Sequence, residues 1–156
     1  MKTVVIRECS NIKLDSSYEL NLDTFNPKDC TGCWSCWLKT PGKCIFRDLD
    51  QFHRKYLEAD KVIIFSQIKK GFISGKMKTI IDRLICHYLP YIEISKEGSN
   101  HLARYNKYPD IEFYYEGNFS MKNGKQILED YIIRTFTQYR SKNIMVKDIN
   151  TWGATK

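Results

Sequence analysis

The stretch Lys61-Val-Ile-Ile-Phe-Ser66 places consecutive large apolar residues in the middle of the chain. Such a run is typical of a strand that is buried on both faces of a parallel sheet. After a short loop, Ser74 is a suitable N-cap for a segment whose apolar residues recur at helical spacing as far as Leu89, and Pro90 stops this pattern. The two segments together predict a βα unit, with a helix over Ser74–Leu89.

Strand and helix patterns alternate on both sides of this unit. Strands are predicted at Thr3–Ile6, Tyr18–Leu22, Ile111–Glu116 and Asn143–Ile149, and helices at Asp48–Ala59, with Asp48 as its N-cap, and at Lys125–Arg140. The alternation predicts an α/β fold in which a doubly wound, mostly parallel sheet is flanked by helices. The length of 156 residues predicts one domain over residues 1–156.

Two segments depart from a regular alternation. Only Cys9–Ser17 separates the first two strands, whereas a parallel crossover normally needs about a dozen residues and usually includes a helix. We therefore expect the first crossover helix to be shortened or missing, unless the two strands pair in another way. Residues Tyr91–Pro109 have no clear period, and we interpret them as an excursion from the central sheet that contacts a second subunit or a cofactor.

A cysteine-rich loop occupies residues 30–44. Cys30, Cys33, Cys36 and Cys44 have the compact spacing with which one loop can wrap a [4Fe–4S] cluster. Tetrahedral zinc would accept the same four sulfurs, although structural zinc sites usually come as two separated pairs. A loop of reduced cysteines without metal is the third interpretation. Cys9 and Cys86 stand alone, and the three histidines share no ligand spacing, so we expect structural roles for all of them.

Composition sets limits on location and partners. No run of apolar residues approaches membrane-spanning length, and the N-terminal apolar run is too short for a signal peptide, which predicts a cytoplasmic protein with no membrane contact. The formal charge of +7 is spread along the chain. Basic and aromatic residues alternate in Arg104-Tyr105-Asn106-Lys107-Tyr108, but this single segment is no recognised module, so we expect no nucleic-acid binding.

Several motifs resemble a known family. Cys30-x-x-Cys33-x-x-Cys36, Gly42-Lys43-Cys44 and Gly71–Lys78 running into Asp82-Arg83 are similar to the iron–sulfur flavoproteins within the NADPH-dependent FMN reductase group. The resemblance implies a flavodoxin-like fold, FMN at the carboxyl ends of the strands, a nearby cluster, and a homo-oligomer that transfers electrons. It also implies an oxidoreductase, if flavin is bound, whose partner is NAD(P)H or a redox protein.

On this resemblance, three loops would hold FMN. Their residues are Ser10 and Asn11 in the first, Ser66, Gln67, Ile68, Lys69, Lys70 and Gly71 in the second, and Gly117 and Asn118 in the third. The first loop has no glycine, and the second has Ser66-Gln67-Ile68-Lys69 where the family typically has Ser-Pro-x-Tyr. We therefore expect the phosphate end of any flavin to be held weakly. The alternative is a degenerate flavodoxin-like protein without flavin that acts as a metal-stabilised or interaction subunit.

Overall fold

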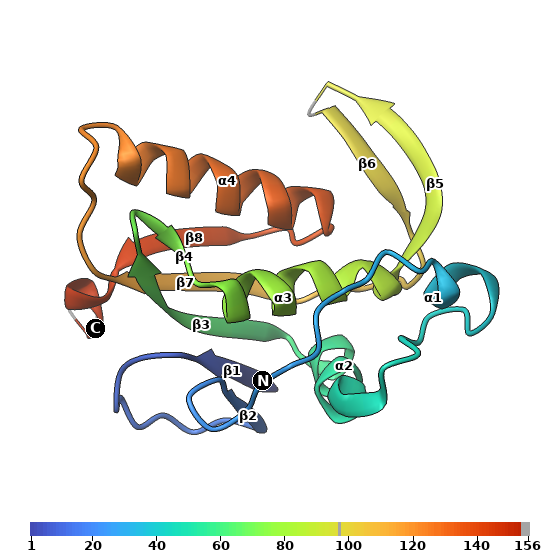
Figure 1. Ribbon diagram of the computed structural model, residues 1–156, viewed down its shortest axis with the longest axis horizontal. Coiled ribbons are helices and arrows are strands. Elements are labelled where there is room, and N and C mark those ends of the chain that lie inside the picture. The colour runs from blue at the N-terminus through green and yellow to red at the C-terminus, as the bar shows by residue number, and fades with distance from the viewer. Residues whose placement is uncertain (97, 154–156) are drawn as a thin grey trace.

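A parallel sheet forms the centre of the molecule (Figure 1). The computed structural model describes residues 1–96 and 98–153. The sheet contains β1 (Thr3–Arg7), β2 (Tyr18–Asn21), β3 (Lys61–Lys69), β7 (Asp110–Glu116) and β8 (Ile144–Asp148) in the order β2-β1-β3-β7-β8. All four neighbouring pairs in this order are parallel. The predicted α/β class with a flavodoxin-like parallel sheet is confirmed.

In residues 1–96 and 98–153, four α-helices and two 3-10 segments lie between strands, and a third 3-10 segment follows the last strand. The helices are α1 (Ser35–Leu38), α2 (Asp50–Glu58), α3 (Gly75–Arg83) and α4 (Gly124–Gln138), and the 3-10 segments are η1 (Arg47–Leu49), η2 (Leu84–His87) and η3 (Ile149–Thr151). Ser74 caps α3 as predicted, because its Oγ accepts a hydrogen bond of 3.1 Å from the Met77 N–H. Asp48 is not the N-cap of α2, which begins two residues later.

The strands bury alternate residues on opposite faces of the sheet. Val4, Ile6, Val62, Ile64 and Phe113 belong to the main core, which also contains the buried faces of α2, α3 and α4. The other face holds a smaller cluster of Val5, Ile63, Phe65 and Tyr114, covered by the loop after β1 and by Ile149 and Trp152. Within the described residues, the α-helices of the core therefore pack on one face, and the apolar run at β3 is buried on both sides.

The short first crossover has a simple explanation in the structure. β1 and β2 pair in parallel, with Val4 opposite Tyr18, and the residues between them form a loop without a helix. This confirms the expected missing crossover helix. Because that loop carries Ile12 and Leu14 against the sheet, it covers part of the face that a crossover helix would otherwise occupy.

The predicted helix Ser74–Leu89 is too long. The α-helix ends at Arg83, η2 follows, and the chain becomes extended at Tyr88. Tyr88 stacks between Tyr108 and Tyr139, and its hydroxyl donates to the Tyr139 carbonyl at 2.7 Å. These tertiary contacts hold residue 88 in an extended backbone although the apolar spacing continues.

The excursion forms a β-hairpin that the sequence pattern did not indicate. β5 (Tyr88–Ser95) and β6 (Gly98–Ala103) pair antiparallel in a separate sheet that projects away from the central one (Figure 1). The hairpin thus lies in a sheet of its own. Arg134 on α4 secures the hairpin by donating to the Ser99 carbonyl at 2.6 Å and to the Asn100 side chain at 3.0 Å.

Candidate functional site

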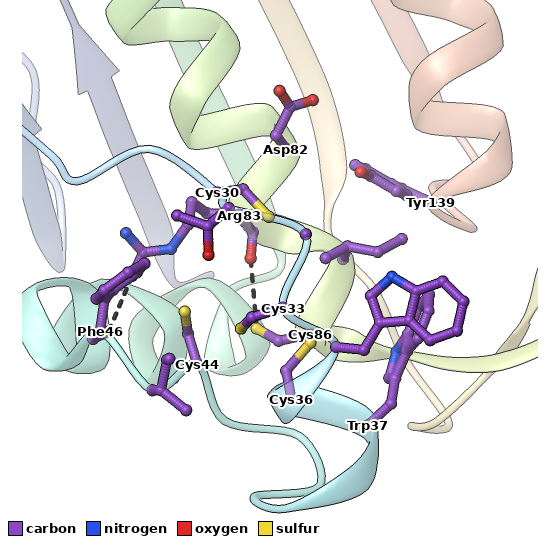
Figure 2. A pocket seen from close by; sticks show the side chains of 15 residues that line it. Cys30, Cys33, Cys36, Trp37, Cys44, Phe46, Asp82, Arg83, Cys86 and Tyr139 are labelled. Atoms are coloured by element: carbon purple, nitrogen blue, oxygen red, sulfur yellow. Dashed lines mark hydrogen bonds between the residues drawn. The ribbon is translucent and has the colours of Figure 1, made fainter.

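The four predicted ligand cysteines line one cavity. Its volume is about 350 Å³, and the segment between β2 and η1 forms one wall while the end of α3 and η2 form another (Figure 2). Cys30 and Cys33 are exposed, and Cys36 and Cys44 are partly buried. The structure thus brings together four thiols that lie within fifteen residues of sequence.

Left-handed backbone residues bend the loop around this cavity. Gly32 and Trp34 have φ of 63° and 59°, and α1 begins directly after Trp34. The chain then folds back, because the Gly42 N–H donates to the Cys36 carbonyl at 3.0 Å. A Cβ at Gly42 would come within 3.0 Å of the Tyr105 hydroxyl, and φ is 81°, so glycine is required where the loop returns toward Cys44.

Arg83 fixes both ends of the loop. Its side chain, 1% exposed, donates to the Lys28 carbonyl at 2.6 Å and to the Phe46 carbonyl at 2.9 Å. It also pairs with the Asp48 carboxylate at 2.9 Å, which in turn accepts the Lys28 N–H. Partial burial raises the pKa of Asp48, but the hydrogen bonds from Arg83 and Lys28 outweigh it and lower that pKa overall. The expected capping residue therefore acts as a loop anchor.

The thiols influence one another electrostatically. Burial raises the pKa of Cys36, and the neighbouring Cys44, Cys30 and Cys33 raise it further, because adjacent thiolates repel each other. At Cys33, hydrogen bonds from the side chain and backbone of Ser35 lower the pKa. A bound cationic centre would relieve this repulsion, so the donor set fits a metal site.

A single zinc ion would need its thiolate ligands close together. With bonds of about 2.3 Å, a tetrahedral zinc ion would draw its thiolates to about 3.8 Å from one another. Among the described residues, no three of the cysteine sulfurs are gathered in such a compact group. A cavity of about 350 Å³ is also far larger than one ion. The four thiols around this cavity could therefore hold a metal centre.

A second group of potential ligands lies beneath the cavity. The ligand atoms of His53, Cys86 and His87 lie within 4.8 Å of one another, and all three residues are buried. Burial, followed by the charge of Arg83, lowers the pKa of His53 to about 4. Cys86 also lines the cysteine cavity. No spacing rule in the sequence connects these residues, because His53 comes from α2 and the other two from η2.

The predicted flavin loops are arranged differently from the expectation. β3 continues through Lys69, and β4 (Phe72–Ile73) pairs back on it, so Ser66–Gly71 is a strand and a tight turn and not an open loop. Lys70 and Gly71 form the turn, with φ of 53° and 81°. This correction follows from Ile68, which is buried in the core against Gly117.

The remaining flavin residues lie around the carboxyl ends of the strands. Ser10 has φ of 74° in the loop after β1, and Asn11 is exposed beside it. Ser66 and Gln67 both donate to the carboxylate of Glu8, which lies just after the end of β1 and beside β3. The residues present at this point do not fit a flavin phosphate. Gly117 and Asn118 line a separate open cavity of about 620 Å³ beside the start of α4.

Comparisons with known proteins agree with the motifs and the fold. No protein-family model matches the chain. An iron–sulfur flavoprotein of Methanocaldococcus jannaschii is 33% identical over 85 residues, covering 52% of this chain and 43% of that protein. An iron–sulfur flavoprotein of Archaeoglobus fulgidus is 41% identical over 63 residues, covering 40% of this chain and 26% of that protein. The chain thus spans less than half the length of either relative.

The solved structures extend the likeness over the whole fold. An azoreductase from Bacillus anthracis str. Sterne superimposes with a TM-score of 0.59 over 99% of this chain and 90% of that one, at 15% identity. No helix in the described part of the chain has the length and apolar character needed to cross a membrane. The resemblance seen in the motifs is therefore confirmed: the chain is similar in sequence to the iron–sulfur flavoproteins and has the flavodoxin-like fold of the azoreductase.

Proposed function

We propose that this chain is an electron-transfer protein of the iron–sulfur flavoprotein type, with a [4Fe–4S] cluster held by Cys30, Cys33, Cys36 and Cys44. The observation that carries the proposal is the cavity of about 350 Å³ lined by all four thiols. A bound cluster would supply one-electron transfer. The curated relatives named iron–sulfur flavoproteins support the same reading.

The surrounding side chains prepare the site for this role. Arg83 holds both ends of the loop and places a buried positive charge in the lining of the cysteine cavity. Trp37 covers one side, and its indole N–H donates to the Tyr88 carbonyl at 3.0 Å. Cys30 and Cys33 remain exposed, which leaves a short path for electrons to a partner at the surface.

Flavin binding is the second part of the proposal. A flavin that passes one or two electrons would connect a two-electron donor such as NAD(P)H to a one-electron centre or to a redox partner protein. The support is the naming of the relatives, together with the flavodoxin-like sheet. A flavin-free, metal-stabilised subunit is the alternative, and it is favoured by Glu8, which already takes up the donors of Ser66 and Gln67.

Electron paramagnetic resonance tests the cluster directly. Protein purified without oxygen and reduced by dithionite should show the signal of a reduced cluster, and Cys36→Ser should lose it. A zinc-bound or metal-free chain has no such signal. Its absence from fully reduced wild-type protein would contradict the proposal.

A further inference from the structure

The sheet order creates a switch point between β1 and β3. The chain leaves β1 toward β2 on one side and returns to β3 on the other, so the loops after β1 and β3 run in opposite directions. In open α/β sheets, ligands bind outside the carboxyl ends of the strands at this point, and FMN does so in flavodoxin-like proteins. Here Arg7 at the end of β1 lies opposite Phe65 on β3, and the next residue is Glu8.

Glu8 fills the switch point with its own carboxylate. The residue is 9% exposed, and its N–H donates to the Phe65 carbonyl at 2.9 Å. Its Oε2 accepts the Ser66 hydroxyl and the Gln67 N–H, each at 3.1 Å, and its Oε1 accepts the Ser74 hydroxyl. Ser74 is the N-cap of α3, so the carboxylate also lies near the positive end of a helix. Hydroxyls, a backbone N–H and a helix start are the groups that would otherwise receive a phosphate.

The loop after β1 presents carbonyl oxygens to a cation of the same chain. The Arg7 guanidinium donates to two carbonyls of this loop, that of Ser10 at 2.7 Å and that of Ile12 at 3.1 Å. The Ile12 N–H is already used by the Ser10 hydroxyl at 3.1 Å. These carbonyl oxygens therefore face a positive charge, which the guanidinium of Arg7 supplies.

A second carboxylate increases the negative charge at this edge. Burial, then a hydrogen bond with Glu116 and the charges of Glu116 and Glu8, together raise the pKa of the Cys9 thiol to about 12. Cys9 therefore stays protonated between these carboxylates. Two carboxylates near the switch point repel any further anion placed there.

We propose that Glu8 is a specificity-determining residue that keeps the 5′-phosphate of FMN out of the β1/β3 switch point. This inference rests on the proposed flavin function and deepens it, because a flavin taken up at this edge is recognised by its ring and ribityl chain. Riboflavin then binds at least as tightly as FMN. The carboxylate of Glu8 occupies the position that the phosphate of FMN would otherwise take.

The test measures riboflavin and FMN dissociation constants by flavin fluorescence on the full chain. Wild type should bind FMN no more tightly than riboflavin. Glu8→Gln removes the charge and keeps the shape of the side chain, whereas Glu8→Ala also removes its volume. The preference for FMN over riboflavin should therefore rise from wild type to Glu8→Gln and then to Glu8→Ala, where it should reach about tenfold or more. Glu129→Gln on α4 removes the same charge away from the switch point and should leave the ratio unchanged.

A second measurement uses inorganic phosphate and needs no flavin. Thermal unfolding of Glu8→Ala or Glu8→Gln should move to higher temperature with added phosphate, while wild type and Glu129→Gln should not respond. A wild type that binds no flavin, with phosphate stabilising a Glu8 variant, would contradict the flavin function and support the role of Glu8. A wild type that prefers FMN by tenfold, or folded Glu8 variants that gain neither FMN preference nor a phosphate response, would overturn the inference.

Discussion

The Arg83 guanidinium and the Asp48 carboxylate pair at 2.9 Å and connect the end of α3 to the chain just after the cysteine loop. Arg83 is almost completely buried, whereas the side chain of Asp48 is 18% exposed. The same guanidinium reaches the Lys28 carbonyl before the first cysteine. One side chain thereby sets the distance between the two ends of the loop.

Removing one partner of this pair should destabilise the protein and loosen the cysteine site. We expect Asp48→Asn to lower the free energy of unfolding by about 3 kcal/mol, because it leaves the Arg83 charge buried without its counter-ion. Bound iron should fall as well. Urea unfolding followed by circular dichroism measures the first effect, and iron analysis measures the second.

The exposed pair Lys78–Asp82 on the same helix is a matched control. Both side chains are more than 40% exposed, so Asp82→Asn should change the free energy of unfolding by less than about 0.5 kcal/mol. Equal losses in the two variants would show that the buried pair has no special role.

Single substitutions of the six cysteines should separate the ligands from the packing residues. Serine at 30, 33, 36 or 44 should lower the bound iron, since each removes one thiolate from the cavity. Cys9→Ser and Cys86→Ser should keep it. For Cys86, burial raises the pKa of the thiol strongly, and the thiol donates to the Arg83 carbonyl at 3.4 Å. Loss of iron in Cys86→Ser comparable to that in Cys36→Ser would show that the ligand set is wrong.

The buried histidine on α2 predicts an acid-sensitive fold. Burial and then Arg83 lower the pKa of His53 from 6.5 to about 4 in the folded state. Between these values the unfolded chain binds more protons, so stability contributed by neutral His53 is present above pH 6.5 and is lost as the pH falls toward 4. The loss should reach about 3 kcal/mol.

Unfolding by urea at several pH values between 4 and 7 checks this prediction. In His53→Gln the dependence on pH should be clearly shallower than in wild type, whatever the absolute stability of the variant. The neighbouring His87 keeps part of the slope, because burial also lowers its pKa. An identical slope in both proteins would contradict the assignment.

The projecting hairpin offers an apolar surface for the homo-oligomer that the family resemblance implies. Ile92 and Ile94 on β5 are 61% and 87% exposed. If this surface joins subunits, Ile92→Lys with Ile94→Lys should produce monomers in analytical ultracentrifugation without changing the melting temperature. Ile127→Lys on α4, where the side chain is 45% exposed, should keep the assembly. A monomeric wild type would refute the prediction.

The sequence predicted those parts of the fold in which local pattern and tertiary structure agree. The buried strand at Val62–Phe65 and the helix cap at Ser74 could be predicted, because the signal for each lies in residues that are neighbours in the sequence. The hairpin of β5 and β6 was not predicted, since Pro90 interrupts the pattern of the first strand and the second is mostly polar. The turn at Lys70-Gly71 lacks the usual Asn-Gly signature of a tight hairpin.

The candidate site was only partly accessible to sequence reasoning. Four cysteines close together in sequence indicate a ligand set by spacing alone. The role of Arg83 and the place of Glu8 depend on where α3 and β3 lie, because their partners are 35 to 66 residues away along the chain. The proximity of His53 to Cys86 likewise depends on the packing of α2 against η2, 33 residues apart in the chain.

The central claim is that the cysteine cavity holds a [4Fe–4S] cluster. Iron and acid-labile sulfide measured on protein purified without oxygen, together with its visible absorption, test it most directly. We predict about four irons and four sulfides per chain, with a broad brown absorption that Cys36→Ser abolishes. Zinc at about one ion per chain, or a colourless chain without iron that fails to take up iron and sulfide on reconstitution, would contradict the claim.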